Sequence, residues 1–69
     1  MITEIDMEYL TFIKTFINIH GYPPSIREIA KSLYVSNTTA HRHLMKLVDN
    51  DLIRYTPKIS RGYSLKGSA

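Results

Sequence analysis

A break at residues 21–24 constrains the fold of this chain more than any other feature. Gly21 readily adopts the left-handed backbone conformation that ends a helix, and Pro23 and Pro24 lack the N–H that a continuing helix needs. Before the break, apolar side chains recur at three- and four-residue spacing, which predicts a helix over about residues 4–19. The stripe expected to be buried consists of Ile5, Tyr9, Leu10, Phe12, Ile13, Phe16, Ile17 and His20.

Two capping signals mark the starts of helices. Ser25 is followed three residues later by Glu28, the spacing of a capping box, and this predicts a short second helix over about residues 26–33. Thr3 and Asp6 form a weaker version of the same signal before the first helix, because Asp replaces the usual Glu.

A third helix is predicted over about residues 37–49. Ser36 is a good N-cap for it, and the connection from the second helix through Tyr34 is short. Asn50 and Asp51 follow its end, and we expect one of them to adopt the left-handed conformation, which Asn and Asp tolerate better than most residues.

The last part of the chain has the pattern of a small hairpin. Residues 52–56 alternate apolar with polar side chains, which predicts a strand, and residues 62–65 are predicted to be the returning strand. The hairpin, or wing, is expected over about residues 52–66. Tyr55 and Tyr63 are expected to form a cross-strand pair rather than a platform for stacking nucleic-acid bases.

This order of helix, helix, helix and hairpin predicts a mainly α fold with a small β-hairpin, the winged helix-turn-helix. At 69 residues and 43% hydrophobic composition, residues 1–69 are expected to be one domain with a modest core. No cysteine is present, which excludes disulfides. The chain contains no apolar run long enough to span a membrane and no secretory signal, so we expect a cytoplasmic protein without membrane contact.

Charge is divided unevenly along the chain. Residues 1–24 hold three acidic side chains and one lysine, a net charge of −2, whereas residues 25–69 hold eight Lys or Arg and three acids, a net charge of +5. A basic half that contains the predicted helix-turn-helix is typical of proteins that bind phosphate backbones. The alternative interpretation is an ordinary basic surface.

Four segments resemble one family. Gly21 to Ala30 resembles the start of the helix-turn-helix in the LexA repressor family, and Ser36 to Leu44 resembles its recognition helix. Leu52 to Arg54 and Ser60 to Gly62 resemble its wing, and the likeness extends over about residues 2–65. The resemblance implies an operator-binding domain from a bacterium or a phage.

Two features depart from the family. LexA repressors carry a second domain that cleaves a linker and forms the dimer, and the sequence ends before such a domain. We therefore expect neither self-cleavage nor dimerisation by that route, and expect an excised DNA-binding domain or a small free-standing regulator. In addition, Tyr34 and Asp51 occupy positions where related folds often have glycine.

The exposed side of the third helix is the expected base-reading surface. By resemblance, the base-reading positions are Ser36, Thr38, Thr39, His41 and Arg42. Arg42 is ranked first because a guanidinium bonds bidentately to guanine, and Asn37 is added because its amide suits adenine. The alternative for residues 37–39 is a solvated, capping start of the helix.

Phosphate contacts are expected from the start of the second helix, from the third helix and from the wing. A helix start offers free backbone N–H groups as well as side chains, and wing residues flank the groove that a recognition helix occupies. The expected phosphate-binding residues are Ser25, Arg27, Lys46, Lys58, Ser60 and Arg61.

No metal, cofactor or catalytic role is expected. His41 and His43 are two residues apart on a helix and so point in different directions, and without cysteine few other ligands remain. We expect His43 to lie against the first helix and His41 to face DNA. No glycine-rich phosphate loop or nucleophile elbow is present, so the chain is not expected to be an enzyme.

The sequence thus favours a sequence-specific transcriptional regulator that binds double-stranded DNA and represses by occluding a promoter. Tight binding is expected to need two copies on a palindromic operator, because one small domain buries little surface. Two alternatives remain open at this point. One is a protein-interaction module, such as a phage antirepressor or assembly factor, with an apolar patch of Ile2, Met45 and Ile59. The other is a DNA-binding module in replication or partition.

Overall fold

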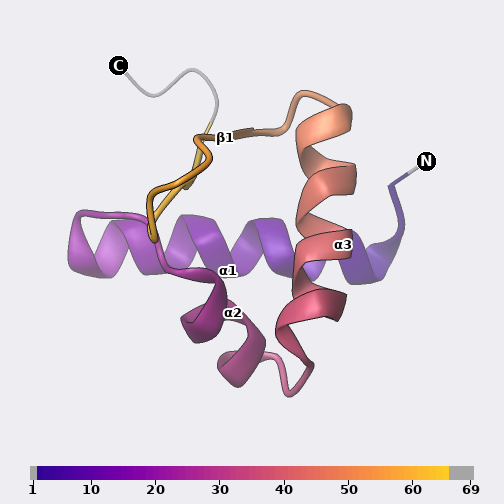
Figure 1. Ribbon diagram of the computed structural model, residues 1–69, viewed down its shortest axis with the longest axis horizontal. Coiled ribbons are helices and arrows are strands. Elements are labelled where there is room, and N and C mark those ends of the chain that lie inside the picture. The colour runs from indigo at the N-terminus through magenta and orange to yellow at the C-terminus, as the bar shows by residue number, and fades with distance from the viewer. Residues whose placement is uncertain (1, 66–69) are drawn as a thin grey trace.

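The computed structural model describes residues 2–65 and contains three helices and a two-stranded antiparallel sheet (Figure 1). The elements are α1 (Glu4–His20), α2 (Ile26–Ser32), α3 (Asn37–Asp49), β1 (Ile53–Tyr55) and β2 (Tyr63–Leu65). The predicted winged helix-turn-helix is confirmed, and each helix begins at the predicted residue and ends within one residue of the predicted end. Position 66, the last of the expected wing, lies outside the described residues.

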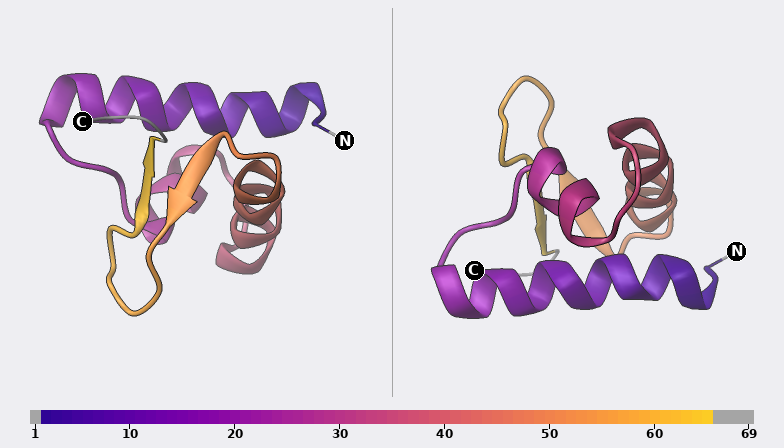
Figure 2. Two further views of the ribbon diagram at one scale, coloured as in Figure 1. Left: turned by 90° about the horizontal axis from the view of Figure 1, so that it is seen from above. Right: turned by 90° about the horizontal axis from the view of Figure 1, so that it is seen from below.

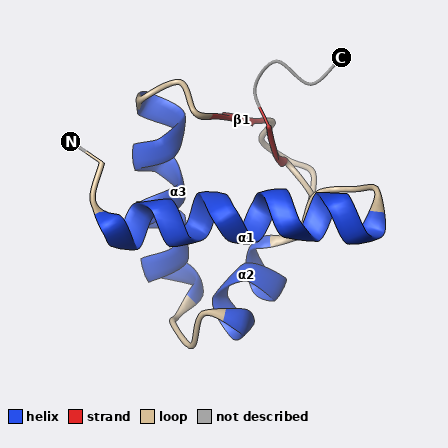
Figure 3. Ribbon diagram, turned by 180° about the vertical axis from the view of Figure 1, so that it is seen from behind, coloured by secondary structure: helices blue, strands red, loops and turns tan. Residues whose placement is uncertain are grey.

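The other elements pack against one side of helix α1. Its 17 residues correspond to about 25 Å, close to the 26 Å of the longest dimension of the molecule. Figure 2 shows α2, α3 and the hairpin on one side of α1, and Figure 3 shows α1 alone crossing the opposite side. In Figure 2, the loop of the hairpin and one end of α3 both extend away from α1, so that the far side of the molecule presents both elements.

The helix ends follow the predicted local chemistry. Asp6 N donates to Thr3 Oγ1 at 3.2 Å and Glu28 N donates to Ser25 Oγ at 3.2 Å, and both capping boxes are complete. Gly21 has φ 81° and its N–H donates to Ile17 O, which ends α1. These contacts span at most four residues, which explains why the sequence pattern predicted them.

Within residues 2–65, three non-glycine residues have a left-handed backbone. Asp51 has φ 62°, which confirms that one residue of the Asn50–Asp51 pair takes this conformation, and Tyr34 has φ 58°. Both are the positions where related folds often have glycine, so the turns keep their geometry without it. The third residue, Lys58 with φ 71°, lies in the loop of the wing and was not anticipated.

The core is built from one face of every helix and from both strands. The largest fully buried apolar side chains of the helices and strands come from α1, α2, α3 and β1 and are Ile13, Ile29, Leu44, Leu47 and Ile53. Between the strands, Ile53 pairs with Leu65 and Tyr55 with Tyr63, and the rings of the two tyrosines stack with centroids 4.9 Å apart. The expected cross-strand tyrosine pair is confirmed.

The predicted buried stripe of α1 is wrong at its two ends. Ile5 is 55% exposed because the buried face of α1 is formed by Asp6, Tyr9, Leu10 and Ile13, and His20, the last residue of the helix, is also exposed. In the first turn the buried position belongs instead to Asp6, whose side chain is completely inaccessible to solvent.

Asp6 joins the start of α1 to α3. Its carboxylate accepts hydrogen bonds from the Thr3 backbone N–H at 2.9 Å, is 2.6 Å from His43 Nδ1 and forms an ion pair with Lys46 Nζ at 2.9 Å. His43 also stacks on Tyr9, with ring centroids 4.8 Å apart, so the prediction that it lies against the first helix is confirmed. Burial raises the pKa of Asp6, but the hydrogen bonds from His43, Thr3 and Lys46 outweigh it and hold that pKa well below its usual range.

We expect Asp6→Asn to lower the free energy of unfolding at pH 7 by about 2 kcal/mol, because it removes the buried negative charge that pairs with Lys46 and contacts His43. Glu8→Gln removes the same charge from an exposed position of α1 and should change it by less than about 0.5 kcal/mol. Since the folded-state pKa is depressed, this stabilisation is present above the ordinary pKa of Asp, about 4, and is lost as pH falls below it. Urea unfolding between pH 2 and pH 7 measures both effects, and equal losses in the two variants would contradict the structural role.

Candidate nucleic-acid interface

A groove of about 590 Å³ lies between the start of α2, the start of α3 and the wing. It collects six residues that the sequence marked for DNA contact, which are Ser25, Arg27, Asn37, His41, Ser60 and Arg61. Ile26, Tyr55, Ile59 and Tyr63 complete its lining. Segments more than thirty residues apart in the sequence therefore contribute to one surface.

The predicted base-reading residues occupy the first turns of α3. Ser36 is the N-cap and its hydroxyl accepts from Thr39 N at 3.1 Å, so part of its hydrogen-bonding capacity is used within the helix. Asn37, Thr38, His41 and Arg42 are exposed, whereas Thr39 is half-buried. The opposite side of α3 is fixed in the core by Ala40, Leu44 and Leu47.

The predicted phosphate-binding residues fall into two groups. Arg27, Lys58 and Ser60 are exposed near the groove or in the wing. Ser25, Lys46 and Arg61 make contacts within the protein, since Ser25 caps α2, Lys46 pairs with Asp6, and Arg61 pairs with Glu28. The structure thus assigns an internal partner to half of the set.

Arg61 links the wing to the start of α2. Its guanidinium bonds to both carboxylate oxygens of Glu28, at 2.6 and 3.3 Å, and donates to the carbonyl of Pro23 at 2.9 Å. The same guanidinium lies over the ring of Tyr22, 4.6 Å from its centroid. The hydrogen bonds from Arg61 and from the Ser25 backbone lower the pKa of Glu28 to about 2.

Gly62 lets the wing close tightly beside this contact. Its carbonyl accepts from Thr56 N at 2.9 Å, and a Cβ atom at position 62 would lie 2.2 Å from the Thr56 carbonyl oxygen. A residue with a side chain would therefore displace the backbone of the hairpin, which places Arg61.

A second contact joins α3 directly to the wing. His41 Nδ1 is 2.7 Å from the hydroxyl oxygen of Tyr63, and the Tyr55 ring packs edge-on against His41 with centroids 6.1 Å apart. Burial raises the pKa of Tyr63 to about 12, with a smaller contribution from Tyr55, so its phenol stays protonated at neutral pH.

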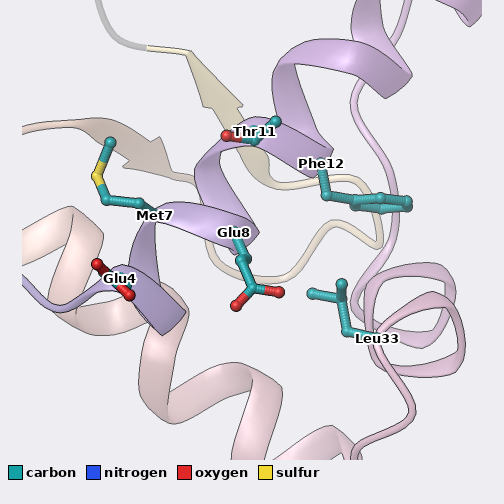
Figure 4. A pocket seen from close by; sticks show the side chains of 6 residues that line it. All are labelled: Glu4, Met7, Glu8, Thr11, Phe12 and Leu33. Carbon is teal, nitrogen blue, oxygen red and sulfur yellow. The ribbon is translucent and has the colours of Figure 1, made fainter.

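A different hollow, of about 400 Å³, lies between α1 and the end of α2 (Figure 4). Met7, Thr11, Phe12 and Leu33 line it, together with the carboxylates of Glu4 and Glu8. Neither carboxylate has an ion-pair partner within residues 2–65. Two unpaired negative charges make this surface unsuitable for a phosphate backbone, and the groove at α3 is left as the candidate interface.

Two other kinds of feature are absent from residues 2–65. None of the described helices is long and apolar enough to cross a membrane. In the same part of the chain, no three His, Asp or Glu side chains gather in a way that could hold a metal ion.

A family model described as the LexA DNA binding domain matches residues 1–62. The chain belongs to this family. Three LexA repressors are similar to it: that of Thermosipho melanesiensis is 42% identical over 93% of this chain, that of Finegoldia magna 38% over 93%, and that of Alkaliphilus oremlandii 42% over 86%. These matches cover 32%, 31% and 29% of the relatives, so the chain spans about a third of their length.

The match to the LexA DNA-binding domain family includes all three helices, β1 and Arg61 but stops before Tyr63. Sequence reasoning did not find the contacts of Tyr63 with His41 or of Asp6 with Lys46. The two residues of each contact are far apart in the chain, and His41 and Tyr63 are separated by 22 residues. No periodic pattern in the sequence connects such distant positions. The one available signal was an acid, Asp6, within an otherwise apolar helix face.

We expect Arg61→Ala to return the pKa of Glu28 from about 2 towards the ordinary value of about 4.3, because its strongest hydrogen-bond donor is lost. A ¹³C NMR titration of the Glu28 carboxyl measures this, and Arg54→Ala, an exposed arginine of β1, is the control. Because the folded-state pKa is depressed, the pair stabilises the fold above about pH 4, and this contribution is lost as pH falls towards 2. An unchanged Glu28 titration would show that the Arg61 contact is not formed in solution.

Proposed function

We propose that residues 1–69 act as one sequence-specific DNA-binding unit of a LexA-like transcriptional repressor. The observation that carries this proposal is the groove between α3 and the wing, which collects six of the DNA-contacting residues expected from the sequence in a chain of the LexA DNA-binding domain family. The basic half of the chain, residues 25–69, contains both α3 and the wing. We assign this surface a binding rather than an enzymatic role, and we expect the protein to act in the cytoplasm.

Base reading is assigned to the exposed side of α3. The apolar contacts of Ala40, Leu44 and Leu47 hold α3 against the rest of the fold, so its first turns are presented as a rigid edge. Arg42 is exposed and has no ion-pair partner within residues 2–65, which leaves its guanidinium free to bond bidentately to guanine. Asn37, Thr38 and His41 are the further exposed candidates.

Phosphate anchoring is assigned to the two sides of the groove. Arg27 lies at the start of α2, and Lys58 and Ser60 lie in the loop of the wing, all with exposed side chains. Arg61 and Lys46 keep 39% of their side chains exposed but hold an internal carboxylate, so their main effect on DNA is to fix the wing and α3. Ser25 acts through the start of α2, which it caps.

Repression is proposed to occur by promoter occlusion by two copies on a palindromic operator. A single small module buries about 600–1,000 Å² on DNA, which is at the low end for tight specific binding. Two copies related by a two-fold axis would double this area and read inverted half-sites. The similar proteins are named LexA repressors, which favours transcriptional control over a role in replication or partition.

The structure weakens the protein-contact alternative. Ile59 is 57% exposed, but Met45 is half-buried and Ile2 packs against the core. The three residues therefore do not form the fully exposed apolar patch that this alternative requires.

We expect Arg42→Ala to cost about 1–3 kcal/mol of specific binding and to relax the preference at one base pair. Lys58→Ala should instead weaken binding to all sequences alike and reduce the slope of log affinity against log salt by about one. Titrations of a selected site and a scrambled duplex at several salt concentrations measure both. If the two variants behaved identically, the division into reading and anchoring residues would be wrong.

Selection from a randomised duplex library at near-physiological salt tests the proposed function itself. We expect enrichment of one motif, with a second, inverted copy at a fixed spacing near 10 base pairs or a multiple of it. A single half-site would contradict binding as two copies. The absence of any enriched motif would contradict sequence-specific binding altogether.

A further inference from the structure

The two ring nitrogens of His41 have different surroundings. Nδ1 is 2.7 Å from the Tyr63 hydroxyl, whereas Nε2 has no hydrogen-bond partner within residues 2–65. The side chain is exposed and lines the groove between α3 and the wing. The two nitrogens are separated by one ring carbon and their hydrogen-bonding directions diverge, so a wing contact through Nδ1 directs Nε2 away from Tyr63.

The donor and acceptor capacity of His41 and Tyr63 determines which nitrogen of the neutral imidazole carries the proton. If Nδ1–H donated to Tyr63, the phenolic proton would need another acceptor, and the described residues supply none. If the Tyr63 hydroxyl donates to Nδ1 instead, every group in the contact is satisfied and the ring proton resides on Nε2. Tyr63 is buried to 4% exposure and stays a neutral phenol at physiological pH, so the proton to donate is always present.

We propose that Tyr63 is a positioning residue that fixes His41 as an Nε2–H donor to a base acceptor in the major groove, a role that rests on the proposed function. The acceptors presented there are N7 and O6 of guanine, N7 of adenine and O4 of thymine. Without Tyr63, the neutral ring would exchange between two tautomers, one of which has only a lone pair at Nε2 and is repelled by these acceptors.

The stacked tyrosine pair makes this contact rigid. Tyr55 lies opposite Tyr63 in the register of the strands, and its ring stacks on Tyr63 at 4.9 Å. The edge of the Tyr55 ring also contacts His41. The ring of Tyr63 therefore has no freedom to swing its hydroxyl away, and the wing determines the direction of a side chain on α3.

Two variants separate the hydroxyl from the ring. Tyr63→Phe removes the proposed donor and keeps the stacked ring, whereas Tyr55→Phe removes a hydroxyl that has no hydrogen-bond partner within residues 2–65. At a pH where His41 is neutral, two-bond ¹⁵N–¹H correlations of the imidazole report the tautomer directly and need no DNA. We expect the Nε2–H tautomer in the wild type and in Tyr55→Phe, and a mixture of tautomers in Tyr63→Phe.

The DNA readout uses the site enriched by the wild type. His41→Ala identifies the base pair that His41 reads, and Tyr63→Phe should reduce the preference at that pair about fivefold, the value of one hydrogen bond. Tyr55→Phe should change it less than twofold. In the His41→Ala background, Tyr63→Phe should have no further effect, because the hydroxyl acts only through His41.

Several results would overturn the inference. An Nδ1–H tautomer in the wild type would reverse the direction of the hydrogen bond. Equal losses in Tyr63→Phe and Tyr55→Phe, or uniform weakening over all sequences, would show a structural or phosphate-contacting role. If the wild type enriched no motif, the proposed function would fail, whereas a normal motif unaffected by Tyr63→Phe would defeat this inference alone.

Discussion

The burial of one side of α3 against the rest of the fold is the constraint on which the whole structure depends. Ala40, Leu44 and Leu47 are completely buried, and they leave the first turns of the same helix exposed. At the far side of the helix, His43 and Lys46 engage the buried carboxylate of Asp6 on α1. Apolar packing thus fixes the position of α3. The contact of Asp6 with His43 and Lys46 depends on direction as well as distance, and so it also restricts the orientation of the helix.

Among the described residues, two polar side-chain contacts attach the wing to this framework. Arg61 ties its base to Glu28 and Pro23 at the start of α2, and Tyr63 ties β2 to His41 on α3. A two-stranded sheet of three-residue strands has little stability of its own. These two contacts, together with Ile53 in the core, explain how so small a hairpin keeps a defined position beside the groove.

The basic side chains of the chain therefore fall into two groups, those that pair with internal carboxylates and those that remain exposed. Lys46 and Arg61 neutralise internal carboxylates and hold elements together, whereas Arg27, Arg42 and Lys58 remain exposed without an ion-pair partner among the described residues. In a 69-residue chain the same basic composition must serve both folding and DNA binding. Counting basic residues from the sequence overestimates the number that are free to meet phosphate, because it does not show which ones already have a carboxylate.

The sequence by itself determined the starts and ends of the helices, the hairpin and the exposed side of α3. These features follow from contacts within about four residues, such as the capping box of Ser25 with Glu28 and the left-handed ends at Gly21 and Asp51. Tertiary structure alone decided that Asp6 is buried while Ile5 is exposed. It also decided the pairs His43–Asp6, Arg61–Glu28 and His41–Tyr63, whose members are 37, 33 and 22 residues apart. Local patterns specify which elements form, but the partners of long polar side chains depend on how those elements pack, and that information is not periodic in the sequence.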